Sequence, residues 1–285
     1  MTTIKIVTDS TADIPKELAE QWDIHILPLK VLMDGETFLD GVTITPSAFF
    51  EKLENVSSFP STSQPSPAEF AEKYQEILDK HGKDTKIISI HLSSSLSGTC
   101  QSARLGANLL DTEADIHVID SSKAAYFLGM IVVEAAKAAK NGKSVDQCIE
   151  LIHKMMKEQK EFFVLDTLTY LQKGGRIGKA QAIVGTLLNV KPILSLNEAG
   201  EVYPFEKVRG KKKAIARILD ECKQYAGVEK VIASVLYGLN REEAEELKDR
   251  LVEEFQIQEI TLTEIGPVIG AHVGPQALGV LMYKP

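Results

Sequence analysis

Residues 86–110 read KIISIHLSSSLSGTCQSARLGANLL, and this stretch decides the class of fold. Residues 86–91 form a short run rich in isoleucine, which predicts a buried strand. Residues 97–110 are expected to form a helix. A strand that passes directly into a helix is the unit from which parallel sheets are built, so the stretch indicates an α/β protein.

The same alternation continues on both sides of this stretch. Strands are expected at residues 4–8 and 116–120, with an apolar extended segment at residues 24–33. Capping boxes at Ser66/Glu69 and Ser144/Gln147 predict the start of two helices. Further helices are expected at residues 15–22, 45–53 and 122–140, and residues 56–64, rich in Ser, Thr and Pro, are expected to be a loop.

The second half has a different rhythm. Residues 191–196 and 202–208 predict a β-hairpin around the turn at residues 197–200, and a Gly-rich turn is expected before a last strand near residue 278. We therefore expect two domains. The first, residues 1–160, is an α/β domain with a parallel sheet, and the second, residues 161–285, is an α/β domain with a mixed or mainly antiparallel sheet. No Pro/Gly linker marks the boundary.

Length, charge and composition argue against several classes of protein. The chain has 285 residues and a net charge of −8, which argues against a protein that coats nucleic acid or anionic membrane. The longest apolar run, residues 124–133, is about half the roughly 20 residues that a membrane-spanning helix needs. The N-terminal residues lack the features of a secretory signal, so we expect a cytoplasmic protein. Three widely spaced cysteines give neither a disulfide framework nor a zinc site.

Three clusters rich in hydroxyl groups lie where strands meet helices, at residues 8–11, 62–66 and 93–99. In open α/β sheets such positions line the usual ligand crevice. A single Ser or Thr there is more often a helix cap. Because only one residue can cap each helix, the surplus predicts donors for a carboxylate or phosphate, and the candidates are Thr62, Ser63, Ser94 and Ser95. Which of the three consecutive serines points inward is left open.

One histidine and several cations complete the set of candidates. His272 lies in GAHVGP (residues 270–275), where flanking glycines allow the backbone to approach a ligand. Arg209 ends a predicted strand and could grip an anion. We expect Arg176, Lys211 and Lys212 to face a partner, although a charged run is usually only a solvated surface.

Two alternative functions remain open on the residues alone. Ser94 or Ser95 with His272 could hydrolyse an acyl or phosphoryl ester, although the sequence names no orienting acid. The basic run at residues 211–213 could bind nucleic acid, but it lacks interleaved aromatic residues. The usual motifs of nucleotide-binding proteins, serine esterases and zinc hydrolases do not occur.

Taken together, the motifs resemble those of the DegV family of bacterial fatty-acid-binding proteins. The matching segments are TDSTADIP (8–15), TSQP (62–65), SSSLSGTCQSA (93–103), DS (120–121), GGRI (174–177), KPIL (191–194), KVR (207–209) and GAHVGP with ALG (270–279). Gln276 stands where this family is expected to have glycine.

The resemblance implies two α/β domains that enclose one fatty acid, such as palmitate, and no catalytic activity or cofactor of its own. It implies that the lipid carboxylate lies at the domain interface, near the Thr62-Ser63 motif, the serine cluster and His272. The implied partner is a fatty acid kinase that makes an acyl phosphate, and transient membrane contact is possible in such a role. Chain-length preference and oligomeric state are left open.

Overall fold

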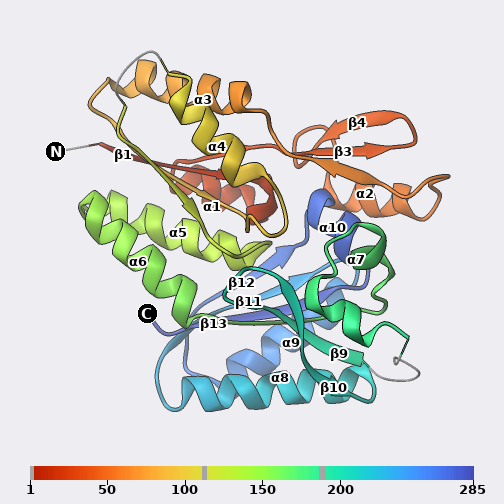
Figure 1. The fold of residues 1–285 in the computed structure, drawn as a ribbon. Coiled ribbons are helices and arrows are strands. Elements are labelled where there is room, and N and C mark those ends of the chain that lie inside the picture. The colour runs from red at the N-terminus through yellow and green to blue at the C-terminus, as the bar shows by residue number, and fades with distance from the viewer. Residues whose placement is uncertain (1–2, 111–113, 186–190) are drawn as a thin grey trace.

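The computed structural model describes residues 3–110, 114–185 and 191–285. Two β-sheets are stacked with helical layers between and outside them (Figure 1). The expected fold class, α/β with a parallel first sheet and a mixed second sheet, is confirmed.

The first sheet is parallel and buried on both faces. Its strands, in spatial order, are β2 (Ile24–Leu27), β1 (Ile4–Asp9), β6 (Lys86–His91) and β7 (Ile116–Asp120). Successive strand residues point to opposite faces. Val7 and Ile87 therefore pack in one apolar cluster and Ile6 and Ile88 in another. This two-sided burial explains the almost continuous apolar run of β6.

The helices in the described residues of the first half are η1 (Ser10–Ala12), α1 (Lys16–Gln21), α2 (Pro46–Leu53), α3 (Pro67–His81), α4 (Thr99–Asn108), α5 (Tyr126–Lys140) and α6 (Val145–Glu158). Both capping boxes are confirmed, at the starts of α3 and α6. Helix α5 begins four residues later than expected, because Ser122 and Ala125 have φ values of 53° and 54°, outside the right-handed helical region.

The second sheet contains six strands. In spatial order they are β10 (Val202–Val208), β9 (Lys191–Leu196), β8 (Lys160–Val164), β13 (Leu278–Tyr283), β11 (Val231–Tyr237) and β12 (Ile257–Glu264). Only β11 and β12 pair in parallel, and the predicted hairpin is confirmed as β9 and β10. The remaining helices are α7 (Thr169–Lys173), η2 (Gly178–Ile183), α8 (Lys211–Ala226), α9 (Arg241–Glu254) and α10 (Pro267–Val273).

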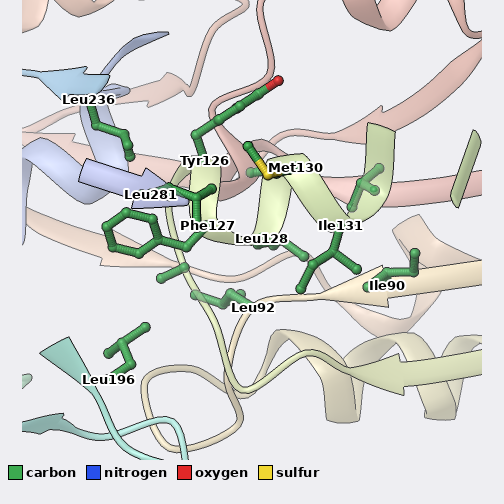
Figure 2. Packing of buried hydrophobic residues seen from close by; sticks show 14 of the residues in the cluster. Ile90, Leu92, Tyr126, Phe127, Leu128, Met130, Ile131, Leu196, Leu236 and Leu281 are labelled. Carbon is green, nitrogen blue, oxygen red and sulfur yellow. The ribbon is translucent and has the colours of Figure 1, made fainter. Parts of the chain in front are cut away.

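Helices α5 and α6 form a layer shared by the two sheets, whereas α3 and α4 cover the outer face of the first sheet and α8 and α9 that of the second (Figure 1). The side chains of α5 belong to one apolar cluster with Ile90 and Leu92 from the first half and with Leu236 and Leu281 from the second (Figure 2). The sheet type changes at β8, yet the core is continuous.

A third, small sheet corrects two sequence-based expectations. Strands β4 (Glu36–Leu39), β3 (Lys30–Met33) and β5 (Ser61–Ser63) pair antiparallel in that order. Residues 61–63 therefore form a strand within the segment expected to be a loop. The glycine-rich segment expected to be a turn contains α10, which packs with α2 and β3 in one apolar cluster. Contacts with segments distant in the chain order both β5 and α10.

In the part of the chain that the structure describes, no helix combines the length and apolar character needed to cross a bilayer.

Candidate ligand-binding site

An apolar cavity of about 220 Å³ lies between the two halves of the molecule. The carboxyl-terminal ends of β6 and β7 lead into it, because Leu92 follows β6 and Ala124 follows β7 by a few residues. Most of its lining is aliphatic or aromatic, and side chains from both halves contribute: Leu92, Phe127, Phe163, Leu196, Leu236 and Ile265. A cavity with such walls favours an apolar guest.

The polar end of the cavity is built around two side chains. Thr62 Oγ1 and His272 Nε2 lie 2.9 Å apart, and both residues line the cavity. Ser63, Gln64 and Ser97 add further polar groups to the same lining. The cavity therefore has mostly apolar walls and one end that can hydrogen-bond a polar group.

Local structure explains how these two residues meet. Thr62 lies on β5, opposite the fully buried Val31 of β3, so pairing with β3 fixes its position. His272 lies in the last turn of α10, whose Val268 and Ala271 pack against the small sheet and α2. The apolar face of α10 thus positions the imidazole beside β5.

A close approach of backbone to imidazole explains one glycine. A Cβ atom at Gly174 would lie 2.2 Å from Nδ1 of His272. Only glycine leaves room for the ring at this point, just after α7. The GGRI motif therefore shapes the polar end of the cavity.

Burial of the His272 side chain, together with the smaller effect of the nearby Arg176 guanidinium, lowers its pKa from 6.5 to about 4. The imidazole is consequently neutral at physiological pH. Arg176 also lines the cavity, and its guanidinium donates to Leu96 O at 3.0 Å and to Gly174 O at 2.6 Å. A fixed positive charge beside a neutral histidine suits an anionic head group.

A second cavity, of about 510 Å³, adjoins the polar end. It shares Thr62, Arg176 and His272 with the first cavity and is also lined by the exposed residues Ser61 and Lys173. The polar end is therefore reached from solvent through this vestibule, whereas the apolar part extends toward the shared core.

The serine cluster has a different arrangement from the one expected. Ser97 lines the cavity, and Ser94 and Ser95 are not among its lining residues. Ser95 Oγ donates to Ala199 O at 2.6 Å, and buried Ser93 Oγ donates to Gly200 O at 3.0 Å. Two of the three consecutive serines thus bind the β9–β10 turn of the second half, and the Ser94 N–H donates to Asp120.

The candidate cations lie away from the cavity, apart from Arg176. Arg209 is exposed at the end of β10 and does not line the cavity. At the start of α8, Lys212 is exposed, and Lys211 Nζ pairs with Glu243 Oε2 at 2.6 Å.

A buried Ser-His-Asp arrangement occurs elsewhere. His91 Nδ1 lies 2.9 Å from Asp9 Oδ2, and its Nε2 lies 2.7 Å from Ser89 Oγ. All three residues are fully buried, and Ser89 Oγ also bonds the hydroxyl of Tyr74. No substrate reaches this serine, so the network is structural.

The Ser/His pair considered for a hydrolase has a different geometry. His272 Nε2 is hydrogen-bonded to Thr62, and neither Ser94 nor Ser95 lines the cavity that His272 lines.

Sequence reasoning missed Ser97 and Gln64 as lining residues. Both lie in motifs that the sequence shows, the serine cluster and TSQP, but the local pattern predicts Ser97 only as the start of a helix. Gln64 Nε2 donates to Ser102 Oγ at 3.2 Å, and Gly98 lies against this amide because a Cβ atom there would be 2.5 Å from Nε2. This packing holds the Gln64 side chain at the cavity.

Comparisons with known proteins agree with this architecture. The sequence model of a family described as "Uncharacterised protein, DegV family" matches residues 3–285. A DegV domain-containing protein of Listeria innocua is 39% identical over 280 residues, which cover 97% of each chain.

Three solved structures are similar over nearly the whole chain. A fatty-acid-binding DegV family protein from Thermus thermophilus has a TM-score of 0.92 at 35% identity and covers 100% of both chains. DegV of Bacillus subtilis, described as a fatty acid binding protein, has a TM-score of 0.90 at 36% identity and 99% coverage of both chains. A stearic acid-binding protein from Eubacterium ventriosum has a TM-score of 0.89 at 27% identity, covering 99% of this chain and 98% of that one.

Proposed function

Because this chain belongs to the DegV family, we propose that it binds one long-chain fatty acid in the cavity between its two halves and presents the carboxyl group to a fatty acid kinase. The observation that supports this most directly is the cavity itself, with apolar walls and a single polar end at Thr62 and His272. Similar solved structures that are described as fatty acid binding proteins support the class of ligand.

The tail supplies most of the affinity in this proposal. Burying a chain of about sixteen carbons at roughly 0.8 kcal/mol per CH2 contributes on the order of 12 kcal/mol before the cost of association. The head group then needs only to be oriented. A sixteen-carbon acid such as palmitate is therefore a reasonable first ligand to test.

The head group is held by neutral donors. With His272 neutral, its Nε2–H donates to Thr62 Oγ1, and the Thr62 hydroxyl donates to the lipid carboxylate. Ser63 and Ser97 supply further hydroxyls at the same end, and Arg176 supplies a positive charge. Hydroxyl groups can donate hydrogen bonds to a carboxylate and to the acyl phosphate formed from it, whereas a tight buried ion pair would oppose that conversion.

In this proposal the second cavity, the vestibule, allows the carboxyl group to be presented to the kinase. Thr62, Arg176 and His272 lie at the junction of the two cavities, so a carboxyl bound there faces solvent while the tail is covered. In this proposal the chain itself performs no chemistry. The kinase approaches over the vestibule, and Arg176, Lys211, Lys212 and Arg209 contribute positive charge for an acidic partner surface.

Native mass spectrometry of the protein purified from bacteria tests the proposal. We expect one acyl species per chain and a higher melting temperature after palmitate is added to delipidated protein. If no acyl species co-purifies and palmitate leaves the melting temperature unchanged, lipid binding is excluded. If the lipid binds but a fatty acid kinase does not phosphorylate it, binding stands and presentation fails.

A further inference from the structure

A cluster of potential metal ligands lies at the opposite end of the parallel sheet from the lipid cavity. One nitrogen of His25, one nitrogen of His81 and one carboxylate oxygen of Asp23 all lie within 4.8 Å of one another. We propose that these three residues form a site for a divalent first-row transition-metal ion of the Zn²⁺ type. Two imidazoles and one carboxylate are a ligand set that such ions prefer.

The position of the cluster separates it from the lipid site. His25 is the second residue of β2, and Asp23 immediately precedes that strand, so both lie at the amino-terminal edge of the parallel sheet. The lipid cavity lies at the carboxyl-terminal edge, beyond Leu92 and Ala124. The two sites are therefore independent, and this inference does not rest on the proposed function.

Both imidazoles have a buried atom that needs a partner. Nε2 of His25 and Nε2 of His81 are inaccessible to solvent and have no hydrogen-bond partner among the described residues. A buried polar atom without a partner is costly, and a metal ion would satisfy both. The two rings meet edge to face, with centroids 6.5 Å apart, so they border a common space.

The backbone around the cluster also suits a cation. His81 is the last residue of the 15-residue helix α3, where the unpaired carbonyl groups and the helix dipole favour positive charge. Asp23 has a φ value of 52°, which turns the chain sharply between α1 and β2 and brings its carboxylate beside His25. Asp23 is exposed and both histidines are partly buried, so the ion has a path from solvent.

Ion binding requires a small closure of the ligands. Zn²⁺ bonds of roughly 2.0 to 2.2 Å place tetrahedral ligand atoms about 3.4 Å apart. Because the ligand atoms lie within 4.8 Å of one another, they must approach by at most about 1.4 Å. Rotation of the exposed Asp23 side chain and of the His81 ring at the helix end can supply this movement.

The neighbouring charges predict how the affinity can be changed. Lys5 Nζ pairs with Asp23 Oδ2 and competes with the ion for the carboxylate. Lys73 and Lys80 add positive charge near the histidines, and Glu76 adds negative charge. Burial of the two rings and the nearby Lys5 lower the pKa of each histidine, although the Asp23 carboxylate opposes this, so both rings are largely neutral and offer a lone pair at pH values near 7.5.

Calorimetric titration of untagged, chelator-treated protein with Zn²⁺ tests the proposal. We expect saturable binding of one ion per chain and no comparable binding of Mg²⁺, which prefers oxygen ligands. His25→Ala, His81→Ala and Asp23→Asn should each weaken binding at least tenfold. His153→Ala, which removes an exposed histidine from α6, is the matched control and should leave the affinity unchanged.

One further variant is expected to bind Zn²⁺ more tightly than wild type, and misfolding cannot explain a gain of affinity. Lys5→Met removes the competing ammonium group and should tighten Zn²⁺ binding several-fold, whereas the three ligand variants weaken it. Wild-type protein that shows no one-to-one binding, or His25→Ala and His81→Ala proteins that bind Zn²⁺ as wild type does, would overturn the proposal. Lack of any gain in Lys5→Met would refute the role given to Asp23.

Discussion

Thr62 Oγ1 and His272 Nε2 lie 2.9 Å apart although 210 residues separate them in the chain. One comes from a three-residue strand of the first half and the other from a short helix of the second. This contact spans the two halves at the polar end of the cavity, so the geometry of the proposed head-group site depends on how the halves pack together.

Thr62→Val removes the hydroxyl while keeping the shape of the side chain. We expect palmitate affinity to fall by about tenfold to a hundredfold, the equivalent of about 1.5 to 3 kcal/mol for a hydrogen bond to a charged group. The tail still provides most of the binding energy, so lipid should co-purify while kinase-dependent phosphorylation drops sharply. His272→Ala should behave in the same way.

Thr85→Val is the control for the Thr62→Val and His272→Ala variants. Thr85 is buried outside the cavity lining, and its hydroxyl has no hydrogen-bond partner in the described ranges. Affinity and phosphorylation should stay at the wild-type level there. Equal loss of lipid occupancy and phosphorylation in Thr62→Val would show that head and tail are not recognised separately.

Gly174→Ala places a methyl group against the His272 ring. Because that Cβ would lie 2.2 Å from Nδ1, the imidazole must move away from Thr62, at an overpacking cost of about 1 to 3 kcal/mol. We expect weaker palmitate binding and weaker phosphorylation, measured by titration and kinase assay. The double variant Gly174→Ala/His272→Ala should lose little more than His272→Ala alone, and additive losses would contradict the mechanism.

Ser95→Ala distinguishes a non-catalytic lipid carrier, as proposed, from a serine hydrolase. Its Oγ donates to Ala199 O at an exposed contact between the halves, so the variant should lose about 1 kcal/mol of unfolding free energy or less and keep its lipid affinity. Ser97→Ala, which alters the cavity lining, should weaken palmitate binding instead. Ester hydrolysis by the wild type that disappears in Ser95→Ala would contradict the carrier assignment.

Asp40 predicts a dependence of stability on pH. The Asp40 residue is 3% exposed, and burial raises the pKa of its carboxyl from 3.8 to about 6, while a hydrogen bond from Ser10 limits the rise. A raised pKa in the folded state means that the stabilisation is complete below about pH 4 and is lost as the pH rises through 6. Asp40→Asn, which does not titrate, should therefore gain up to about 3 kcal/mol over wild type between pH 4 and pH 7.

Urea denaturation at several pH values measures this difference. Asp84→Asn, at an exposed loop position, is the control and should differ from wild type by the same small amount at each pH. A constant difference between Asp40→Asn and wild type across the range would show that the Asp40 carboxyl does not titrate as proposed.

Lys212→Glu tests the surface proposed for the kinase. Lys212 is exposed at the start of α8 and lies outside the cavity lining, so lipid affinity should be unchanged. We expect slower phosphorylation at low salt and a smaller effect at high salt, because the lost attraction is screened. Lys83→Glu, an exposed change of equal charge between α3 and β6, should have no such effect, and equal behaviour of the two variants would reject this surface.

Features that depend on neighbouring residues could be predicted from the amino-acid sequence. Isoleucine-rich runs, capping boxes at Ser66 and Ser144, and the turn after Leu196 fixed the strands, helix starts and hairpin, because each depends on residues close together in the chain. The same reasoning identified Thr62 and His272 as candidates and carried the family resemblance.

Which of the candidate residues lie together at the cavity depends on the tertiary structure. Strand β5 has three residues, too few to show an alternating pattern, and it exists because it pairs with β3. Ser97 lines the cavity while Ser93 and Ser95 bind the β9–β10 turn, a difference set by packing between the halves. Contacts across about 100 to 200 residues of chain depend on the assembled core, and no local sequence pattern encodes them.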